Sequence, residues 1–122
     1  PAAEDVPLTD ANRVGIREGV WPDRICTDFT GIYDTVGVAL LKDAGESDLI
    51  LMDEIGQGEN EAEQFHQAVL TLLDGDTPVM GVVRDKPGVL PDLVRAHPNV
   101  QVTVVTVENR DRILEQLLAE RR

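Results

Sequence analysis

Three short apolar runs are spaced along this sequence. They cover residues 48–52, 77–83 and 100–105, and each is bounded by polar or turn-forming residues. An apolar run of this length is typical of a strand buried in a parallel sheet. Pro78 removes one backbone donor from the second run, which a position near the start of a strand tolerates. The pattern therefore predicts strands at about 48–53, 77–83 and 100–105.

Four segments beside these runs carry apolar residues at helical spacing. They cover residues 33–44, 60–74, 91–96 and the stretch after Thr106. Asn60, with Glu63 after it, forms a capping-box pattern, and Thr106 is placed to cap the last helix. The stripes expected to face the core are Val36, Leu40 and Ala44, then Ala62, Phe65, Val69, Leu72 and Leu73, and finally Ile113, Leu114, Leu117 and Leu118.

The order of these elements predicts the fold class. A helix is followed by β-α-β-α-β-α, and strands separated by helices of this size imply right-handed crossovers and parallel pairing. We expect an α/β domain over residues 31–122, with three layers and a mostly parallel sheet flanked by helices. Residues 1–30 are a poorly defined amino-terminal arm or short strands, with 14–16 and 20–21 as the strand candidates.

The composition limits the classes of binding partner and the cellular location that we expect for this chain. The chain has 122 residues and a net charge of −12, which disfavours nucleic acid and anionic membranes as partners. Aromatic residues make up only 3%, so the core must be aliphatic. The single cysteine, Cys26, forms no internal disulfide, and its expected role is that of a small buried apolar residue. No signal peptide or transmembrane span is visible, so the expected location is cytoplasmic.

The first candidate site lies at the end of the first apolar run. Asp53 and Glu54 are adjacent carboxylates at the carboxyl end of a predicted strand, where open α/β sheets place their ligands. In P-loop NTPases this is the Walker B position, where the Asp helps to hold Mg²⁺ and a following Glu acts on the attacking water. The alternative is that the pair merely ends the strand and begins a solvated loop.

The phosphate-binding half of such a site is absent from the sequence. The loop pattern G-x-x-x-x-G-K-[ST] occurs nowhere. The two lysines of the chain are Lys42 and Lys86, and neither follows a glycine in that pattern. The chain therefore carries the metal-and-water half of a nucleotide site without the phosphate half.

Two further candidates flank the carboxylate pair. Glu59, with Glu61 and Glu63, could extend a divalent-cation site, although such a cluster is more typical of a solvated helix amino terminus. Arg84 ends the second predicted strand at the same edge. It could stabilise charge on a terminal phosphate, or it could be a surface arginine paired with Asp85.

Asn109 and Arg110 are the last candidates. They follow the third predicted strand, in a region where P-loop NTPases often contact the base. The alternative for Asn109 is structural, because its side chain can tie the loop to the start of the last helix through bonds to the backbone.

These residues together resemble one family. The matching segments are 33–37, Asp53-Glu54-Ile55-Gly56, Glu59, Phe65, 78–83 and Thr106-Val107-Glu108-Asn109-Arg110-Asp111 with Ile113-Leu114. They resemble the small nucleoside-triphosphatase family of P-loop NTPases, to which the cancer-related nucleoside-triphosphatase belongs, and the resemblance covers residues 31–118.

The resemblance implies a nucleotide-hydrolysing α/β fold that uses Mg²⁺. Asp53 would then bind the metal, with Glu59 as a further acid, and Glu54 would be the catalytic base. Arg84 would be the arginine of the family pattern, and Asn109 and Arg110 would match its Glu-Asn-Arg segment, which begins here at Glu108.

The chain departs from the family by lacking its first strand and phosphate loop. That strand would lie in the middle of the sheet, so its absence implies an open cleft edged by apolar strands, which invites pairing with another chain. The chain could be a fragment, receive the strand from a partner chain, or be a remodelled fold in which residues 12–30 fill the gap.

Two main functions follow from these alternatives. The first is the Walker B-bearing part of a Mg²⁺-dependent nucleoside-triphosphate hydrolase, which binds a nucleoside triphosphate once its site is completed. The second is a non-catalytic interaction module, or pseudo-NTPase, that binds a partner or a second copy through the open sheet edge. A weaker third option is a sensor of small ligands or divalent cations.

Overall fold

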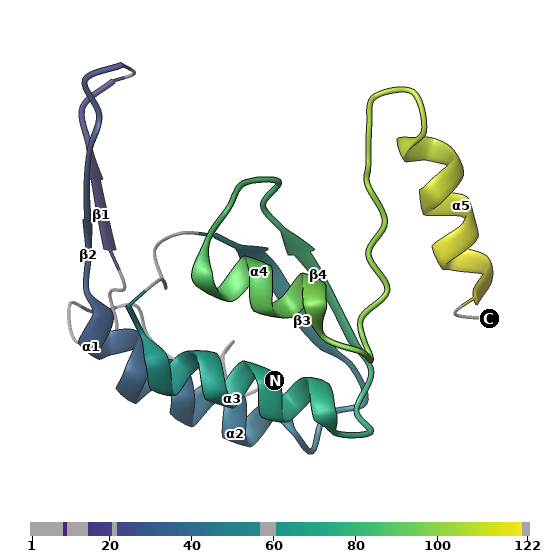
Figure 1. The fold of residues 1–122 in the computed structure, drawn as a ribbon, viewed down its shortest axis with the longest axis horizontal. Coiled ribbons are helices and arrows are strands. Elements are labelled where there is room, and N and C mark those ends of the chain that lie inside the picture. The colour runs from purple at the N-terminus through teal and green to yellow at the C-terminus, as the bar shows by residue number, and fades with distance from the viewer. Residues whose placement is uncertain (1–8, 10–14, 21, 57–60, 121–122) are drawn as a thin grey trace.

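The computed structural model describes Thr9 and residues 15–20, 22–56 and 61–120. Figure 1 shows a central body from which two parts project, a hairpin near the amino terminus and a carboxyl-terminal arm. The elements are β1 (Gly15–Glu18), β2 (Ile25–Asp28), α1 (Thr30–Ile32), the π-helical segment η3 (Tyr33–Gly37), α2 (Val38–Ala44), β3 (Ile50–Ile55), α3 (Glu63–Asp74), β4 (Val79–Val83), α4 (Val89–Ala96) and α5 (Arg110–Glu120). We call residues 30–56 and 61–100 the body, and residues 101–120 the arm.

The projecting hairpin consists of β1 and β2. The two strands pair antiparallel, with Gly15 opposite Asp28 and Glu18 opposite Ile25. Gly19 follows β1 with a φ of 87°, a conformation that glycine adopts without strain. Of the two strand candidates in this region, the first lies at β1. The second predicted strand, residues 20–21, is wrong at Val20, because Val20 lies in the connection between β1 and β2. Trp21 lies outside the described residues.

The first helix of the body runs continuously through α1, η3 and α2. The sequence predicted it correctly over 33–44, and it begins earlier, at Thr30. Its π-helical turn lies where α3 crosses closely: a Cβ at Gly37 would be 3.0 Å from Cδ2 of Phe65. Tyr33 completes this contact, since its ring meets that of Phe65 edge to face with centroids 5.3 Å apart.

The sheet of the body consists of β3 and β4. They pair in parallel, with Ile50 opposite Val79 and Met52 opposite Gly81. These strands are two of the three predicted from apolar runs. The two strands pair directly, so no gap lies between them. Among the described residues, the outer edge of each strand has no partner strand, so an open sheet edge remains at the outside of the pair.

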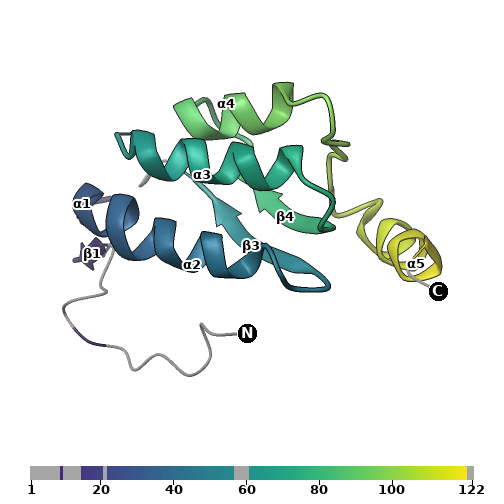
Figure 2. The same ribbon diagram turned by 90° about the horizontal axis from the view of Figure 1, so that it is seen from below.

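Helices α2, α3 and α4 form one layer against one face of this sheet (Figure 2). The core lies between helices and sheet and contains Ile55, Val69, Leu90 and Val94, with Met52, Phe65 and Val83 packed against it. The α/β class with a parallel, helix-flanked sheet is thus confirmed. The opposite face carries exposed Leu51, Met80 and Val82, so the described residues supply no second helical layer.

The arm differs from its predicted structure. Residues 101–105 form no strand with any described residue, so the predicted third strand is wrong. The segment is apolar enough for a strand, but no described strand lies beside it to accept its hydrogen bonds. The last helix was predicted correctly as α5. Of its apolar stripe only Ile113 is buried, and the others are exposed: Leu114, Leu117 and Leu118.

No helix within the described ranges is long and apolar enough to cross a membrane.

Candidate functional site

The two adjacent carboxylates lie at a β-bulge near the carboxyl end of β3. Met52 is opposite Gly81 and Ile55 is opposite Val83, so Asp53 and Glu54 together face one residue of β4. A bulge of this kind re-aims side chains and is frequent beside active sites. It also lets both Met52 and Ile55 point into the core, although they are three residues apart on a strand.

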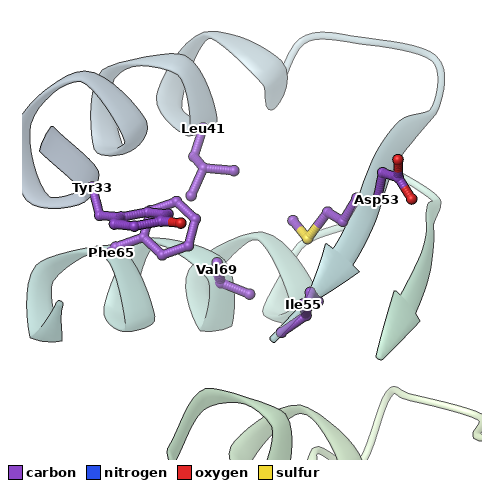
Figure 3. Close-up of a pocket in the computed structure, with 7 residues that line it drawn as sticks. Tyr33, Leu41, Asp53, Ile55, Phe65 and Val69 are labelled. Atoms are coloured by element: carbon purple, nitrogen blue, oxygen red, sulfur yellow. The ribbon is translucent and has the colours of Figure 1, made fainter. Parts of the chain in front are cut away.

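The observed strand is shifted by two residues from the predicted one, 48–53. It begins at Ile50 and continues to Ile55, so Asp53 and Glu54 lie inside its carboxyl-terminal half instead of at its end. Asp53 is exposed, and Figure 3 shows its carboxylate on the side of β3 away from the rings of Tyr33 and Phe65. The position of Asp53 leaves its oxygens accessible to an incoming ligand.

Arg84 lies at the same edge of the sheet. It directly follows β4, and its backbone N–H donates to the carbonyl of Ile55 over 3.0 Å. Its Cδ would be 3.9 Å from a Cβ at Gly56, so its side chain passes over the end of β3. The structure therefore places Arg84 beside Ile55 and Gly56, the two residues that follow the carboxylate pair.

A second arginine, Arg95, holds the loop that Arg84 begins. The guanidinium of Arg95 donates to the carbonyl of Arg84, and to that of Lys86 over 3.0 Å. It also pairs with Asp92 at 2.9 Å on the same helix. Arg95 was missed by the sequence analysis, because its i, i+3 spacing to Asp92 resembles that of any surface ion pair.

A pocket of about 410 Å³ lies on the helical side of β3. Its wall is mostly apolar and aromatic. Asp53 is among the lining residues, although its carboxylate points away from the rings of Tyr33 and Phe65 (Figure 3). The lining residues are Tyr33, Leu41, Met52, Asp53, Ile55, Phe65 and Val69. Apolar walls with few polar groups are typical of small-ligand pockets.

One wall of this pocket is fixed by a contact between distant segments. Asp34 accepts a hydrogen bond of 2.9 Å from the backbone N–H of Phe65, in the first turn of α3. This carboxylate supplies the cap that the sequence assigned to Asn60, which lies outside the described residues. Glu63, the partner in the predicted capping box, is the first residue of the helix.

Asn109 and Arg110 lie on the arm, apart from the sheet (Figure 1). The side chain of Asn109 accepts from the N–H of Thr106 at 2.7 Å and donates to the carbonyl of Val104 at 3.0 Å. In return, the N–H of Asn109 donates to the hydroxyl of Thr106 at 3.3 Å. The structural alternative for Asn109 is thus observed, and the structure does not bring this residue to the carboxylate pair.

Of the predicted metal ligands, Asp53 and Glu59, the structure describes only Asp53. Glu59 lies outside the described residues, and the side chain of Glu54 is not described. Nowhere within the described ranges do three or more His, Cys, Asp or Glu side chains converge as a metal site. Asp53 therefore belongs to no such group of three among the described residues.

A parallel, helix-flanked sheet with a carboxylate pair near its carboxyl end is consistent with a P-loop NTPase-like α/β fold. Comparison with known sequences identifies the family within this class. The sequence model described as NTPase matches residues 12–118, and the chain belongs to this family. The match begins before the hairpin and ends within α5.

Curated relatives support the same family. The chain is 33% identical over 90 residues to the nucleoside-triphosphatase THEP1 of Thermofilum pendens, covering 71% of this chain and 50% of that protein. It is 29% identical over 120 residues to the protein of the same name from Methanopyrus kandleri, covering 94% and 67%. A cancer-related nucleoside-triphosphatase homolog of Bos taurus is 30% identical over 95 residues, covering 70% and 50%.

The chain spans about half the length of the first of these relatives. No solved structure matches the chain.

Proposed function

We propose that this chain is the Walker B-bearing part of a Mg²⁺-dependent nucleoside-triphosphate hydrolase. The observation that carries the proposal is the β-bulge that presents Asp53 and Glu54 at the carboxyl edge of a parallel sheet. Arg84 at the same edge supports it. The names of the curated relatives agree, since each is described as a nucleoside-triphosphatase.

The donor chemistry of the site fits Mg²⁺. This ion prefers oxygen ligands and is usually bound by one or two carboxylates together with waters and substrate phosphates. The exposed carboxylate of Asp53 meets that requirement, and Glu59 is a candidate for a second acid. When bound, the ion would neutralise charge on the phosphates, an effect that a chain of net charge −12 needs if it is to attract a nucleotide.

The remaining residues have separate proposed roles. Glu54 is the general base that orients or deprotonates the attacking water. Arg84 stabilises charge that develops on the terminal phosphate. Asn109 and Arg110 are candidates for contacts to the base only by their match to the family's Glu-Asn-Arg segment.

The groups that bind the phosphates must come from outside this chain. In P-loop proteins, the backbone amides of the phosphate loop and its lysine contribute most of the binding to the phosphates, and the sequence pattern of that loop is absent here. We therefore expect weak nucleotide binding by this chain alone, in the millimolar range, and no measurable turnover until a phosphate loop completes the site.

Isothermal titration of Mg²⁺-ATP and Mg²⁺-GTP into the pure chain tests this proposal. Binding should disappear in Asp53→Asn, because the metal loses its carboxylate. It should persist in Asp48→Asn, the matched control, since Asp48 is an exposed aspartate near the opposite end of β3. Binding that is equal in both variants, or absent at millimolar nucleotide, contradicts the proposal.

A second candidate function is a non-catalytic interaction module. The observation that favours it is the exposed apolar face of the sheet, where Leu51 is 71% and Val82 is 60% accessible. Single exposed apolar residues are ordinary, but neighbouring ones on one sheet face indicate a surface that another protein covers. Absence of nucleotide binding, together with stable self-association or partner binding, would favour this function.

A further inference from the structure

Residues 84–88, which connect β4 to α4, are held by one side chain of the helix. Arg95 lies in the last turn of α4. Its Nη2 donates to the carbonyl of Arg84, and to the carbonyl of Lys86 over 3.0 Å. These two carbonyls precede Arg95 by 11 and 9 residues. One guanidinium therefore joins the end of the sheet to the end of the helix.

The guanidinium of Arg95 is oriented from its own helix. Its Nη1 donates to the carboxylate of Asp92 over 2.9 Å, one turn earlier in α4. A partly exposed ion pair of this kind contributes little to stability, so its main effect here is to fix the plane of the guanidinium. Arginine presents its N–H donors in a rigid plane, whereas the ammonium of lysine has no such plane. The three bonds together therefore favour arginine at this position.

The backbone of Arg84 is held from two sides. Its N–H donates to the carbonyl of Ile55, the last residue of β3, over 3.0 Å. Its own carbonyl accepts from Arg95. Because both backbone polar groups are bonded to other elements, the point from which the side chain of Arg84 departs is fixed at the end of β3. That side chain passes Gly56, where a Cβ would be 3.9 Å from its Cδ.

Helix α4 is a rigid support for this arrangement. Leu90 is fully buried and Val94 nearly so, and both belong to the core of the body. The helix also holds the far end of the connection, because the N–H of Asp92 donates to the carbonyl of Gly88 over 3.0 Å. A side chain that positions another does so best from a packed element. Arg95 thus ties the position of Arg84 to that of α4.

We propose that Arg95 is a positioning residue for Arg84, and that through Arg84 it sets a preference of the site for nucleoside triphosphates over diphosphates. The inference rests on the proposed function, in which Arg84 stabilises charge on the terminal phosphate. Arg95 itself contacts no phosphate, since its Nη atoms bond to two carbonyls and a carboxylate. Without Arg95, the connection and Arg84 would have to be ordered when the nucleotide binds. That cost falls on the triphosphate, the nucleotide that Arg84 contacts.

Titration of Mg²⁺-ATP and of Mg²⁺-ADP into the full chain, followed by NMR, measures this preference as the ratio of two dissociation constants. We expect the unmodified chain to favour ATP. Arg84→Gln should reduce the preference by about tenfold, which corresponds to the loss of a charged hydrogen bond. Arg95→Gln should reduce it by at least about threefold, since it removes bonds to two carbonyls. Arg95→Lys should reduce it less, because an ammonium can still donate to one of them.

A double variant separates positioning from a general structural role. If Arg95 acts only through Arg84, the variant Arg84→Gln/Arg95→Gln should lose no more of the preference than Arg84→Gln alone. A merely structural role of Arg95 would weaken the binding of both nucleotides equally and leave their ratio unchanged. Arg112→Gln is the matched control, because it removes the same charge from an exposed arginine of α5. The ratio should be unchanged in this control.

A second measurement needs no nucleotide. NMR relaxation of the side-chain Nε–H of Arg84 reports the motion of its guanidinium on the ps–ns timescale. We expect this group to be more ordered in the unmodified chain and in Arg112→Gln than in Arg95→Gln. Circular dichroism verifies that each variant is folded. If Arg95→Gln fails to fold, Arg95→Lys takes its place in both measurements.

The outcomes distinguish failure of this inference from failure of the proposed function. Absence of binding of both nucleotides contradicts the proposed function, and the order of the Arg84 side chain then decides the positioning role. An unchanged ratio in Arg95→Gln, additive losses in the double variant, or an unchanged order of Arg84 overturns the inference while nucleotide binding persists. Equal affinity of the unmodified chain for ATP and ADP overturns it as well, because Arg84 then contacts no terminal phosphate.

Discussion

The second strand of the body and the first five residues of the arm carry the same kind of sequence and have different structures. Residues 79–83 form β4, paired with β3 and covered on one face by helices. Residues 101–105 are as rich in valine, yet Val104 is 66% exposed and no described strand pairs with the segment. β-propensity describes how well a residue fits a half-buried pleated surface. A segment of high β-propensity therefore forms a strand only where a neighbouring strand pairs with it.

The two last helices of the chain repeat this contrast. α4 buries Leu90 completely and Val94 nearly so, whereas α5 leaves Leu118 53% exposed. Both have apolar residues at helical spacing. Most helix stability in proteins comes from packing of the apolar face, so α5 depends on a covering surface that α4 already has.

The largest expected difference between the body and the arm is in the loss of unfolding free energy when a leucine is replaced by alanine. Leu90→Ala should lower the free energy of unfolding by about 2–5 kcal/mol, because it removes buried methyl groups and leaves a cavity. Leu118→Ala should change it by less than about 0.5 kcal/mol, measured by urea denaturation at a concentration where the chain is monomeric. Equal costs would show that the arm is packed in the monomer.

A smaller effect is expected from glycines in the first helix of the body. Gly37→Ala should cost about 1–3 kcal/mol, because the new methyl group must displace the ring of Phe65. Gly31→Ala is the matched control, since a Cβ there meets nothing within 4 Å, and it should stabilise by up to about 1 kcal/mol. Thermal denaturation of both variants measures the difference. Identical shifts would contradict the close approach of η3 and α3.

The smallest expected effects separate a long-range cap from a local one. Asp34→Ala removes the carboxylate that caps α3 from another element and should cost about 0.5–2 kcal/mol in global unfolding. Asn109→Ala removes bonds made only within residues 104–109. It should speed amide exchange at the start of α5 without changing global stability in the monomer. A global loss in Asn109→Ala would place α5 in the cooperative unit of the body.

At the candidate site too, the sequence pattern predicted some features, and others depend on tertiary packing. The position of Asp53 and Glu54 near the carboxyl end of a strand followed from one apolar run, and Arg84 followed from the next. The bulge beneath the pair did not, because it depends on the register between two strands. Arg95 and Asp34 were missed for a similar reason, since each acts on backbone groups of another segment.

The sequence by itself determined the α/β class, the order of helices and strands in the body, and the family to which the chain belongs. These follow from periodicity and motif, which are local properties. Only the tertiary structure decided that β3 pairs directly with β4, that residues 101–105 stay unpaired among the described residues, and that one sheet face is exposed. Each of these depends on which surfaces pack together, and the spacing of apolar residues in one segment does not specify which other segment covers them.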